Sequence, residues 1–408
     1  AIAWKLSKSP LVDKIYVAPG NAGTAAIGVN LPIEVSDIQD IAKAAKYHEI
    51  DITIVGPEIP LEAGIIDLFH KEGMAAFGPK QEAARIESSK VFAKNLMLKH
   101  QIPTAPAEVF DSYIEACRYI ESTRPPIVVK ADGLAAGKGV TVATTQESAI
   151  NAAKECLVDH IFGPAGDMIL IEECLTGQEV SVFAFTDGKS ISPLIAACDY
   201  KRAYDNDLGP NTGGMGSYSP PLFWNHELER EIRDTIVGPT IAALQKEGIE
   251  YTGVLYSGIM LTRNGPKVIE FNCRLGDPEA QVILPRLSTD LMEIILAVTN
   301  RNLHETTIAW QEMATVGVVI ASGGYPGKYK TGIPINGLIE AEEIGLVFHA
   351  GSRNGPKEIV TDGGRVLTLV GQGYSLDEAR DLAYAGASKI EFEDAFYRHD
   401  IAIDKRNQ

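Results

Sequence analysis

The chain has 408 residues, of which 45% are hydrophobic, so it is long enough to bury a large core and to form two or three domains. Its 37 Lys and Arg residues against 54 Asp and Glu residues give a formal net charge of −17, which disfavours binding to nucleic acid or to an anionic membrane. The five cysteines form no C-x-x-C pair, which argues against a zinc site or a disulfide framework and favours a reducing cytoplasm.

The first part of the chain alternates short apolar strands with helices, the pattern of an α/β domain with a parallel sheet. Each predicted strand ends in a turn-rich loop, and carboxyl ends of parallel strands are where such sheets bind ligands. We therefore expect a small-molecule pocket there, although any one loop could be an ordinary turn. The predicted strands are 15–18, 52–55 and 75–77, the predicted helices are 38–47 and 61–71, and the loops are Pro19-Gly20-Asn21, Gly56-Pro57-Glu58 and Gly78-Pro79.

A glycine-rich loop lies between two predicted strands, 126–130 and 140–143, after a predicted helix at 90–99. Its sequence is Lys130-Ala-Asp-Gly133-Leu-Ala-Ala-Gly137-Lys138-Gly139. The loop is not a Walker A motif, because no Ser or Thr follows Lys138 and a strand follows instead of a helix. Glycines leave backbone N–H groups free to face anions, as in a flap over phosphates, but they also suit an ordinary hairpin. Lys130 favours the flap, because an ammonium at the end of an apolar strand needs a counter-charge such as phosphate.

Two further segments carry polar groups after apolar strands. A predicted strand at 168–172 runs into Glu172-Glu173-Cys174-Leu175 and Gly177-Gln-Glu179, which could offer adenine its backbone and a ribose a carboxylate, or could simply be a strand with solvated acids. Many backbone N–H donors follow in Asp199-Tyr-Lys201 and in the glycine-rich run 209–216. They fit either an anion site or a mobile surface loop.

The segment Lys267-Val-Ile-Glu270-Phe-Asn272-Cys-Arg274 places a carboxylate, an amide and a guanidinium at every second residue. On a strand these side chains share one face, with Glu270 and Asn272 roughly 7 Å apart at Cα. Ile269 and Phe271 should then face the core. Asn264-Gly265 predicts a hairpin that pairs 254–262 with 267–271. Hard oxygen ligands suit Mg²⁺ or Mn²⁺, and a site with two protein ligands points to a nucleotide that completes the coordination.

From residue 303 onward we predict strands at 315–322, 346–350 and 366–371 and a helix at 376–389, which together form a third, smaller domain. The longest apolar runs, such as 316–321, are far too short to span a bilayer. No internal repeat or long linker is present, so we expect domains that share a cleft.

Taken in order, these motifs resemble the ATP-grasp ligases and, among them, the phosphoribosylamine–glycine ligase family. The resemblance implies an α/β and α+β multidomain chain: a Rossmann-like domain at 1–87 with a parallel sheet, an ATP-grasp domain at 88–300 with a glycine-loop lid at about 107–178, and a small mixed β/α domain at 301–408. The family's first strand would precede Ala1, in keeping with the missing initiating Met.

The resemblance also implies an activity, in which glycine is joined to 5-phosphoribosylamine through glycyl phosphate, with ATP consumed, in purine biosynthesis. It implies roles for individual residues, as follows. Mg²⁺ or Mn²⁺ would be bound by Glu270 and Asn272, and the ATP phosphates by Lys90, Lys130, Gly137, Lys138 and Gly139. Adenine would be contacted by Glu172, Glu173 and Leu175, and the ribose by Glu179. Phosphoribosylamine would be bound by Gly20, Asn21, Gly56, Pro57 and Glu58, and glycine with its activated carboxyl by Asp199, Lys201, Gly213 and Arg274. Many ATP-grasp relatives have a third metal carboxylate on the preceding strand, where Ser257-Gly258-Ile259 offers none.

Three alternatives remain open from the sequence: another ATP-grasp carboxylate–amine ligase or carboxylase, a dinucleotide-dependent oxidoreductase built on the first domain, and a nucleotide sensor without activity. We expect a cytoplasmic monomer or weak homodimer whose partners are ATP, glycine and 5-phosphoribosylamine.

Overall fold

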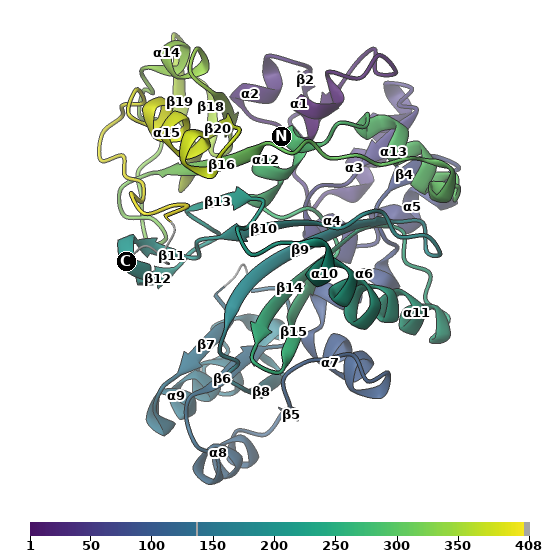
Figure 1. Ribbon diagram of the computed structural model, residues 1–408, viewed down its shortest axis with the longest axis vertical. Coiled ribbons are helices and arrows are strands. Elements are labelled where there is room, and N and C mark those ends of the chain that lie inside the picture. Colours follow the sequence, from purple (N-terminus) through teal and green to yellow (C-terminus); the bar gives the residue numbers. More distant parts are fainter. Residues whose placement is uncertain (136–137, 404–408) are drawn as a thin grey trace. The chain divides into compact units, whose positions relative to one another are not determined.

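The computed structural model describes residues 1–135 and 138–403, and backbone contacts divide the chain into two compact units. The first unit combines Ala1–Asp51, Ile195–Trp224 and the described residues from Leu275 onward, whereas the second combines Ile52–Leu194 and Asn225–Arg274. Each unit therefore draws on segments far apart in the sequence (Figure 1). The domain boundaries expected at residues 87 and 300 come from the resemblance and stay a prediction.

The first unit is built on an antiparallel sheet with the strand order β10-β13-β16-β20-β17. The predicted C-terminal strands correspond to β16, β17 and β20, and the predicted helix to α15, which ends two residues earlier than expected. The strands of this unit are β1 (Tyr16–Val17), β2 (Val29–Asn30), β10 (Ile195–Asp199), β11 (Arg202–Tyr204), β12 (Leu208–Asn211), β13 (Gly216–Ser219), β16 (Ala314–Ala321), β17 (Leu346–His349), β18 (Ser352–Asn354), β19 (Ile359–Thr361) and β20 (Arg365–Gly373). Its α-helices are α1 (Ile2–Leu6), α2 (Ala22–Ala25), α3 (Ile38–Tyr47), α12 (Glu279–Ile283), α13 (Leu291–Thr299), α14 (Leu338–Glu342) and α15 (Leu376–Ala387).

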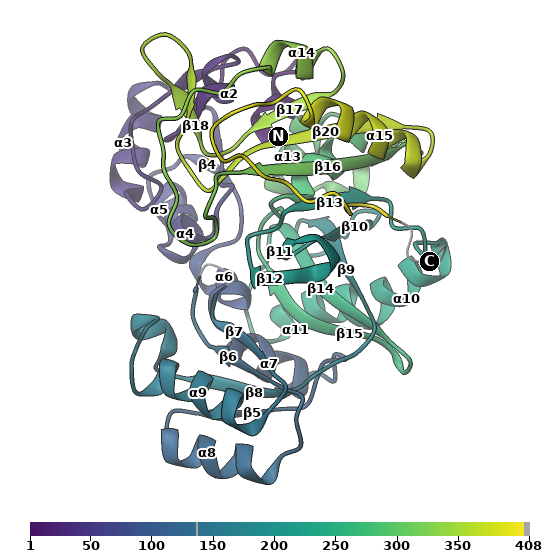
Figure 2. The ribbon, with the colours of Figure 1, turned by 90° about the vertical axis from the view of Figure 1, so that its left-hand side faces the viewer.

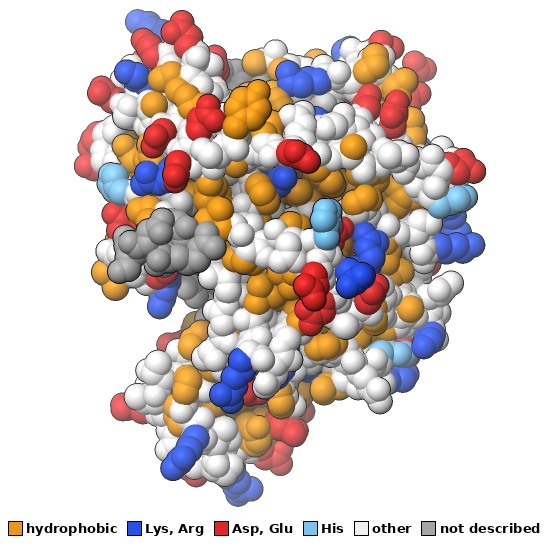
Figure 3. Space-filling model, viewed as in Figure 1, with side chains coloured by type: hydrophobic (Ala, Val, Ile, Leu, Met, Phe, Trp, Pro, Cys, Tyr) orange, Lys and Arg blue, Asp and Glu red, His pale blue; other side chains and the backbone are white. Residues whose placement is uncertain are grey.

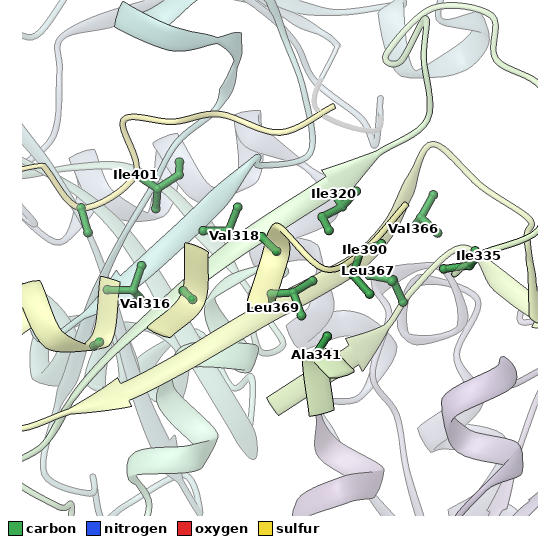
Figure 4. Packing of buried hydrophobic residues seen from close by; sticks show 14 of the residues in the cluster. Val316, Val318, Ile320, Ile335, Ala341, Val366, Leu367, Leu369, Ile390 and Ile401 are labelled. Carbon is green, nitrogen blue, oxygen red and sulfur yellow. The ribbon is translucent and has the colours of Figure 1, made fainter. Parts of the chain in front are cut away.

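Helix α15 packs against β16 and β20 to form the main apolar core of this unit (Figure 4). The alternating residues Val316, Val318 and Ile320 of β16 are fully buried there. The helix turns small residues toward the sheet, and Gly371 of β20 lets it come close, because a Cβ at that position would lie 2.0 Å from the carbonyl oxygen of Ala379. Side-chain volume thus fixes how closely helix and sheet approach.

Helix α3 begins and ends where the apolar periodicity predicts, and its first turn is capped by Asp37, which accepts a hydrogen bond from the amide of Asp40 at 3.0 Å. The short strands β1 and β2, which precede α3 in the sequence, pair in parallel, as expected for an α/β domain.

The second unit contains two antiparallel sheets, with strand orders β15-β14-β9 and β5-β8-β6-β7, and a parallel pair, β3 with β4. Its strands are β3 (Ile52–Ile54), β4 (Ala75–Phe77), β5 (Ala107–Phe110), β6 (Ile127–Ala131), β7 (Val140–Ala143), β8 (Ile169–Glu173), β9 (Gln178–Thr186), β14 (Gly253–Thr262) and β15 (Gly265–Asn272). Its α-helices are α4 (Glu58–Glu62), α5 (Ile65–Lys71), α6 (Gln81–Ser88), α7 (Lys90–Lys99), α8 (Tyr113–Ser122), α9 (Gln146–Leu157), α10 (His226–Ile232) and α11 (Gly238–Lys246).

Helices α8 and α9 lie beside each other over the four-stranded sheet, and α9 packs against β6 and β7 (Figure 2). The buried residues between them are small or branched, including Ala149, Ala153, Ile127 and Val129. This layer carries the predicted phosphate loop, since Lys130 of β6 pairs with Val140 of β7.

One predicted helix of this unit is wrong in detail. Residues 61–71 do not form a single helix, because Gly64 adopts a left-handed conformation with φ of +84° and separates α4 from α5. Glycine tolerates that conformation at little cost, which makes it a natural break between two helices.

None of the helices in the described ranges combines the length and apolar character needed to cross a membrane. On the face in Figure 3, red acidic and blue basic side chains are scattered among apolar ones, and the visible described residues form no large basic surface.

Candidate functional site

The predicted phosphate loop also caps the helix that carries Lys90. Asp132 accepts hydrogen bonds from the amide of Val91 at 2.7 Å and from the hydroxyl of Ser89 at 3.0 Å, so its carboxylate lies at the N-terminus of α7. The ammonium of Lys90 donates to the carbonyl oxygen of Gly133 at 3.0 Å. The loop and Lys90 are thus fixed to each other.

Lys130 is buried, with 4% of its surface exposed, and a carboxylate lies beside its ammonium. Its ammonium lies 2.8 Å from Glu172 Oε2 and donates to the carbonyl oxygen of Ile269 at 3.0 Å. A lysine at this strand end was expected to need a nearby anion, and Glu172 is such an anion, whereas binding of phosphate by Lys130 stays a prediction. Glu172 is therefore not a solvated acid. It also pairs with Lys94 at 3.2 Å, a residue that the sequence analysis missed.

The other residues expected to face adenine and ribose surround the turn from β8 to β9. Glu173 is exposed, whereas Leu175 and Glu179 are partly buried. Gly177 in this turn approaches β14 so closely that a Cβ would lie 2.0 Å from the carbonyl oxygen of Leu261. The turn is therefore held tightly against the neighbouring hairpin.

The expected metal ligands lie on the predicted hairpin, which the structure confirms with a two-residue turn between Thr262 and Gly265. Glu270 and Asn272 are both partly buried and are separated by the buried Phe271. Ile269, which was expected to face the core, is only partly buried. The ladder between β14 and β15 shifts register near this residue, and Val268 is buried instead.

Glu270 lies opposite Gly258 in the hairpin. A Cβ on Gly258 would approach Glu270 Cγ to 3.2 Å, so the glycine leaves room for this carboxylate. Burial lowers the pKa of Lys90, the negative charge of Glu270 opposes that effect, and the positive charge of Lys130 adds to it. Lys90, Lys130 and Glu270 therefore share one electrostatic environment.

Arg274, which follows β15, pairs with two carboxylates. Its Nε lies 2.8 Å from Glu58 Oε2 and its Nη2 lies 3.0 Å from Glu87 Oε1. Glu87 also accepts from the amide of Cys273 at 2.8 Å, yet burial raises its pKa despite the neighbouring guanidinium. Sequence analysis missed Glu87, although an acid on the buried face of α6 is the kind of signal that points to a paired charge. Gly56 and Pro57 immediately precede α4 and lead to Glu58.

In the first unit, the side chain of Asn21 makes hydrogen bonds that hold the local backbone in place. Its Oδ1 accepts from the amide of Thr24 at 2.9 Å, and its Nδ2 donates to the carbonyl oxygen of His349 at 2.8 Å. Gly20 has φ of +80°, and a Cβ there would clash with Asn30. The Gly20-Asn21 turn is therefore rigid, and it is attached to β17.

The glycine-rich run 209–216 also belongs to the first unit, and it is anchored instead of being a mobile loop. The amide of Gly213 donates to the hydroxyl of Tyr325 at 3.0 Å, and its carbonyl oxygen accepts from Arg365 at 2.8 Å. Arg365 in turn pairs with Asp277 at 2.9 Å. Sequence analysis found Gly213 but neither Tyr325 nor Arg365, because both lie more than a hundred residues away.

Asp199 ends β10, and Lys201 follows it with a carbonyl oxygen that accepts from the amide of Thr212 at 2.7 Å. The hairpin β11–β12 after it is tied to the C-terminal segment by the buried Arg398, which donates to the carbonyl oxygen of Arg202 at 3.0 Å.

The expected site residues are thus divided between the two units. Among the residues expected at the phosphate loop, Gly137 lies outside the described residues, Lys138 is exposed, and Gly139 is buried with its carbonyl oxygen bonded to the amide of Ala131 at 2.8 Å. The first unit carries Gly20, Asn21, Asp199, Lys201 and Gly213, and the second carries Gly56, Pro57, Glu58, Lys90, Lys130, Lys138, Gly139, Glu172, Glu173, Leu175, Glu179, Glu270, Asn272 and Arg274.

Three protein-family descriptions match successive parts of the chain: the phosphoribosylglycinamide synthetase N domain at residues 1–87, its ATP-grasp (A) domain at 88–280 and its C domain at 315–404. The chain is 48% identical to the phosphoribosylamine–glycine ligase of Caldanaerobacter subterraneus subsp. tengcongensis over 402 residues, which cover 98% of this chain and 96% of the relative. It is also 48% identical to the chicken trifunctional purine biosynthetic protein adenosine-3, of which it covers 40%.

Among solved structures, the phosphoribosylamine–glycine ligase of Thermotoga maritima matches with a TM-score of 0.85 and 34% identity, over 98% of this chain and 96% of that one. Biotin carboxylase from Campylobacter jejuni matches with a TM-score of 0.72 at 14% identity, over 97% of this chain and 90% of that one, which indicates a shared fold alone.

Proposed function

The chain belongs to the family of phosphoribosylamine–glycine ligases, ATP-dependent ligases of purine biosynthesis with the three-domain ATP-grasp fold, and from that premise we propose which residues do the chemistry. The proposed reaction has two steps. The carboxylate of glycine accepts the γ-phosphoryl group of ATP to give glycyl phosphate and ADP, and the amine of 5-phosphoribosylamine then attacks the carbonyl carbon and displaces phosphate. Activation is needed because a free carboxylate resists attack by an amine.

We propose that Lys90 and Lys130 bind the phosphates of ATP. The observation that carries the proposal is the placement of two ammonium groups near Glu270. Lys130 donates to the carbonyl oxygen of the neighbouring Ile269, and Lys90, which donates to Gly133 of the loop, lies within the electrostatic influence of Glu270 and Lys130. Charge neutralisation and positioning account for most of the catalysis in phosphoryl transfer, so cations fixed by buried contacts suit the task. The backbone of the turn after β8 would hold adenine, and Glu179 would contact the ribose.

A divalent cation is used with ATP throughout the ATP-grasp family, and we propose Glu270 and Asn272 as its protein ligands. The donor set fits, since a carboxylate and an amide oxygen on one strand are hard ligands suited to Mg²⁺ or Mn²⁺. Gly258 keeps the opposite position clear. Among the described residues no group of three or more His, Cys, Asp or Glu side chains could hold a metal, so phosphate and water would complete the shell. A bound cation would neutralise phosphate charge during transfer.

For the remaining substrates we propose roles within each unit. In the first, the amide-rich turn at Gly213, with Asp199 and Lys201, would bind glycine, and the rigid Gly20-Asn21 turn would offer backbone groups to phosphoribosylamine. In the second, Arg274 would stabilise the activated carboxyl, and Gly56, Pro57 and Glu58 would contact phosphoribosylamine. The ion pair between Arg274 and Glu58 supports these two roles, because it holds both side chains in fixed positions.

The test is to incubate the protein with ATP, Mg²⁺, glycine and freshly prepared phosphoribosylamine and to detect glycinamide ribonucleotide by mass. The variant Glu270→Ala should lose glycine-dependent ADP release while its circular dichroism stays native. Glu247→Ala is the matched control, because Glu247 is an acid of the same unit whose ion pairs are with Lys99 and His100. Near-normal turnover of Glu270→Ala would refute the metal assignment. Replacing glycine by bicarbonate or other acids separates this ligase from related ones.

We also propose a cytoplasmic location, on the cysteine pattern of the sequence, and a monomer or weak homodimer. Sedimentation velocity at several protein concentrations tests the second point.

A further inference from the structure

Three charged side chains in the second unit form a buried triad, with Glu172 between Lys94 and Lys130. Their exposed fractions are 5%, 2% and 4% respectively. Lys94 Nζ lies 3.2 Å from Glu172 Oε1, and Lys130 Nζ lies 2.8 Å from Glu172 Oε2. Each carboxylate oxygen therefore has its own ammonium.

The two lysines differ in how their N–H groups are used. An ammonium has three donors, and Lys94 directs its three to Glu172, to Thr104 Oγ1 at 2.7 Å and to the carbonyl oxygen of Ala105 at 2.9 Å. Lys130 has two such partners among the described residues, Glu172 and the carbonyl oxygen of Ile269. Lys94 is thus fixed in place, whereas Lys130 retains capacity for another acceptor.

The triad also carries an excess of positive charge, because two ammonium groups share one carboxylate out of contact with water. A buried ion is costly unless it is compensated, and an excess cation favours the arrival of an anion. When Lys130 turns toward a phosphate, Glu172 loses one partner. An unpaired buried carboxylate would make that movement costly, but Glu172 stays paired with the fixed ammonium of Lys94, which lowers the cost.

We propose that Lys94 is a positioning residue for ATP binding: it holds Glu172 compensated so that Lys130 can exchange this carboxylate for the phosphates. The proposal rests on the proposed role of Lys130. Without Lys94, Lys130 would be the sole counter-ion of Glu172 and would bind it more tightly, at the expense of ATP. Burial lowers the pKa of Lys94 and the charge of Glu172 opposes that effect, which is consistent with this pairing.

The test measures the dissociation constant of ATP with Mg²⁺ by calorimetry, together with the melting temperature, for a set of variants. Lys94→Met should weaken ATP binding about tenfold, a typical coupling between two sites, and leave the KM for glycine near the wild-type value. Adding Glu172→Gln should restore ATP affinity, because the carboxylate that retains Lys130 is then gone. Rescue by a second substitution is not expected of a residue that merely supports the fold.

Lys99→Met is the matched control, since Lys99 lies on the same helix and pairs with Glu247 at 2.7 Å near the surface. The proposal is overturned if Lys94→Met binds ATP as tightly as Lys99→Met, or if the double variant binds no better than Lys94→Met. Should Lys94→Met fail to unfold cooperatively, the comparison of the double variant with Glu172→Gln decides: equal ATP affinities support the proposal, because Lys94 then acts only through the carboxylate, and weaker binding by the double variant overturns it.

Lys130→Met separates this inference from the proposed function. If that variant binds ATP normally, the assignment of Lys130 fails and the inference fails with it. If Lys130→Met loses ATP while Lys94→Met retains it, the inference alone is wrong.

Discussion

Arg274 and Glu58 form an ion pair in which Arg274 Nε lies 2.8 Å from Glu58 Oε2, although they are 216 residues apart in the sequence. The same guanidinium reaches Glu87 at 3.0 Å, so it joins the end of β15 to both α4 and α6. One side chain of the proposed active site is therefore also an organiser of the second unit.

Arg274→Met should both destabilise the protein and stop turnover. Removing the guanidinium leaves the buried Glu87 without its charged partner, and breaking a buried pair in this way costs about 3 kcal/mol of unfolding free energy. Adding Glu87→Gln should recover most of the stability in urea unfolding without recovering ADP release. Equal recovery of both would mean that Arg274 acts on structure alone.

Arg365→Met should impair the use of glycine. The substitution releases Gly213 and Asp277, which Arg365 holds at 2.8 and 2.9 Å. If the turn at Gly213 binds glycine as proposed, its loosening lowers kcat/KM for glycine about tenfold, equivalent to about 1.4 kcal/mol. Initial-rate kinetics check this. Arg353→Met is the control, because Arg353 forms an exposed ion pair with Asp362 in the same unit. Matching kinetics for the two variants would contradict the proposed anchoring.

His349 should make stability depend on pH. Burial lowers the pKa of His349 below its ordinary value of 6.5, so the unfolded chain takes up a proton at higher pH than the folded protein does. His349 therefore contributes its full share of stability above its pKa in the unfolded chain. This contribution is lost as the pH falls from that pKa toward the lower pKa of the folded protein.

The check is urea unfolding of the wild type and His349→Gln at several pH values. As the pH is lowered from about 7.5 to about 5.5, the unfolding free energy of the wild type should fall relative to that of His349→Gln. A difference that is constant over this range would contradict the lowered pKa.

Two glycines near α15 should respond in opposite ways to alanine. At Gly371 a Cβ would lie 2.0 Å from the carbonyl oxygen of Ala379, so Gly371→Ala should destabilise the protein by about 1–3 kcal/mol through overpacking. At Gly386, inside the helix, the nearest atom would be 3.6 Å away, and Gly386→Ala should stabilise by up to about 1 kcal/mol through helix propensity. Thermal unfolding distinguishes them. If both destabilise equally, the close approach of helix and sheet is not the cause.

Helices and strands were predicted well from the sequence where their bounds depend on residues that are neighbours in the chain. Helices α3 and α7 and strand β7 have the predicted bounds, because apolar periodicity and side-chain caps such as Asp37 are properties of neighbouring residues. The hairpin that carries Glu270 was predicted from its turn for the same reason. The exceptions were also local in origin: a left-handed glycine divided one helix, and beside a register shift Val268 is buried while Ile269 is only partly buried.

The sequence by itself determined which chemical groups are present and on which elements they lie: lysines at strand ends, an acid and an amide on one strand, glycines in the turns. Only the tertiary structure decided which of these groups meet. The pairing of Lys130 with Glu172, of Arg274 with Glu87, and of Gly213 with Arg365 joins residues 42, 187 and 152 positions apart, counted from their residue numbers. Charge compensation in a buried site is a property of three-dimensional packing, because each ion needs whichever partner the folded chain brings within reach, and sequence spacing does not encode that distance.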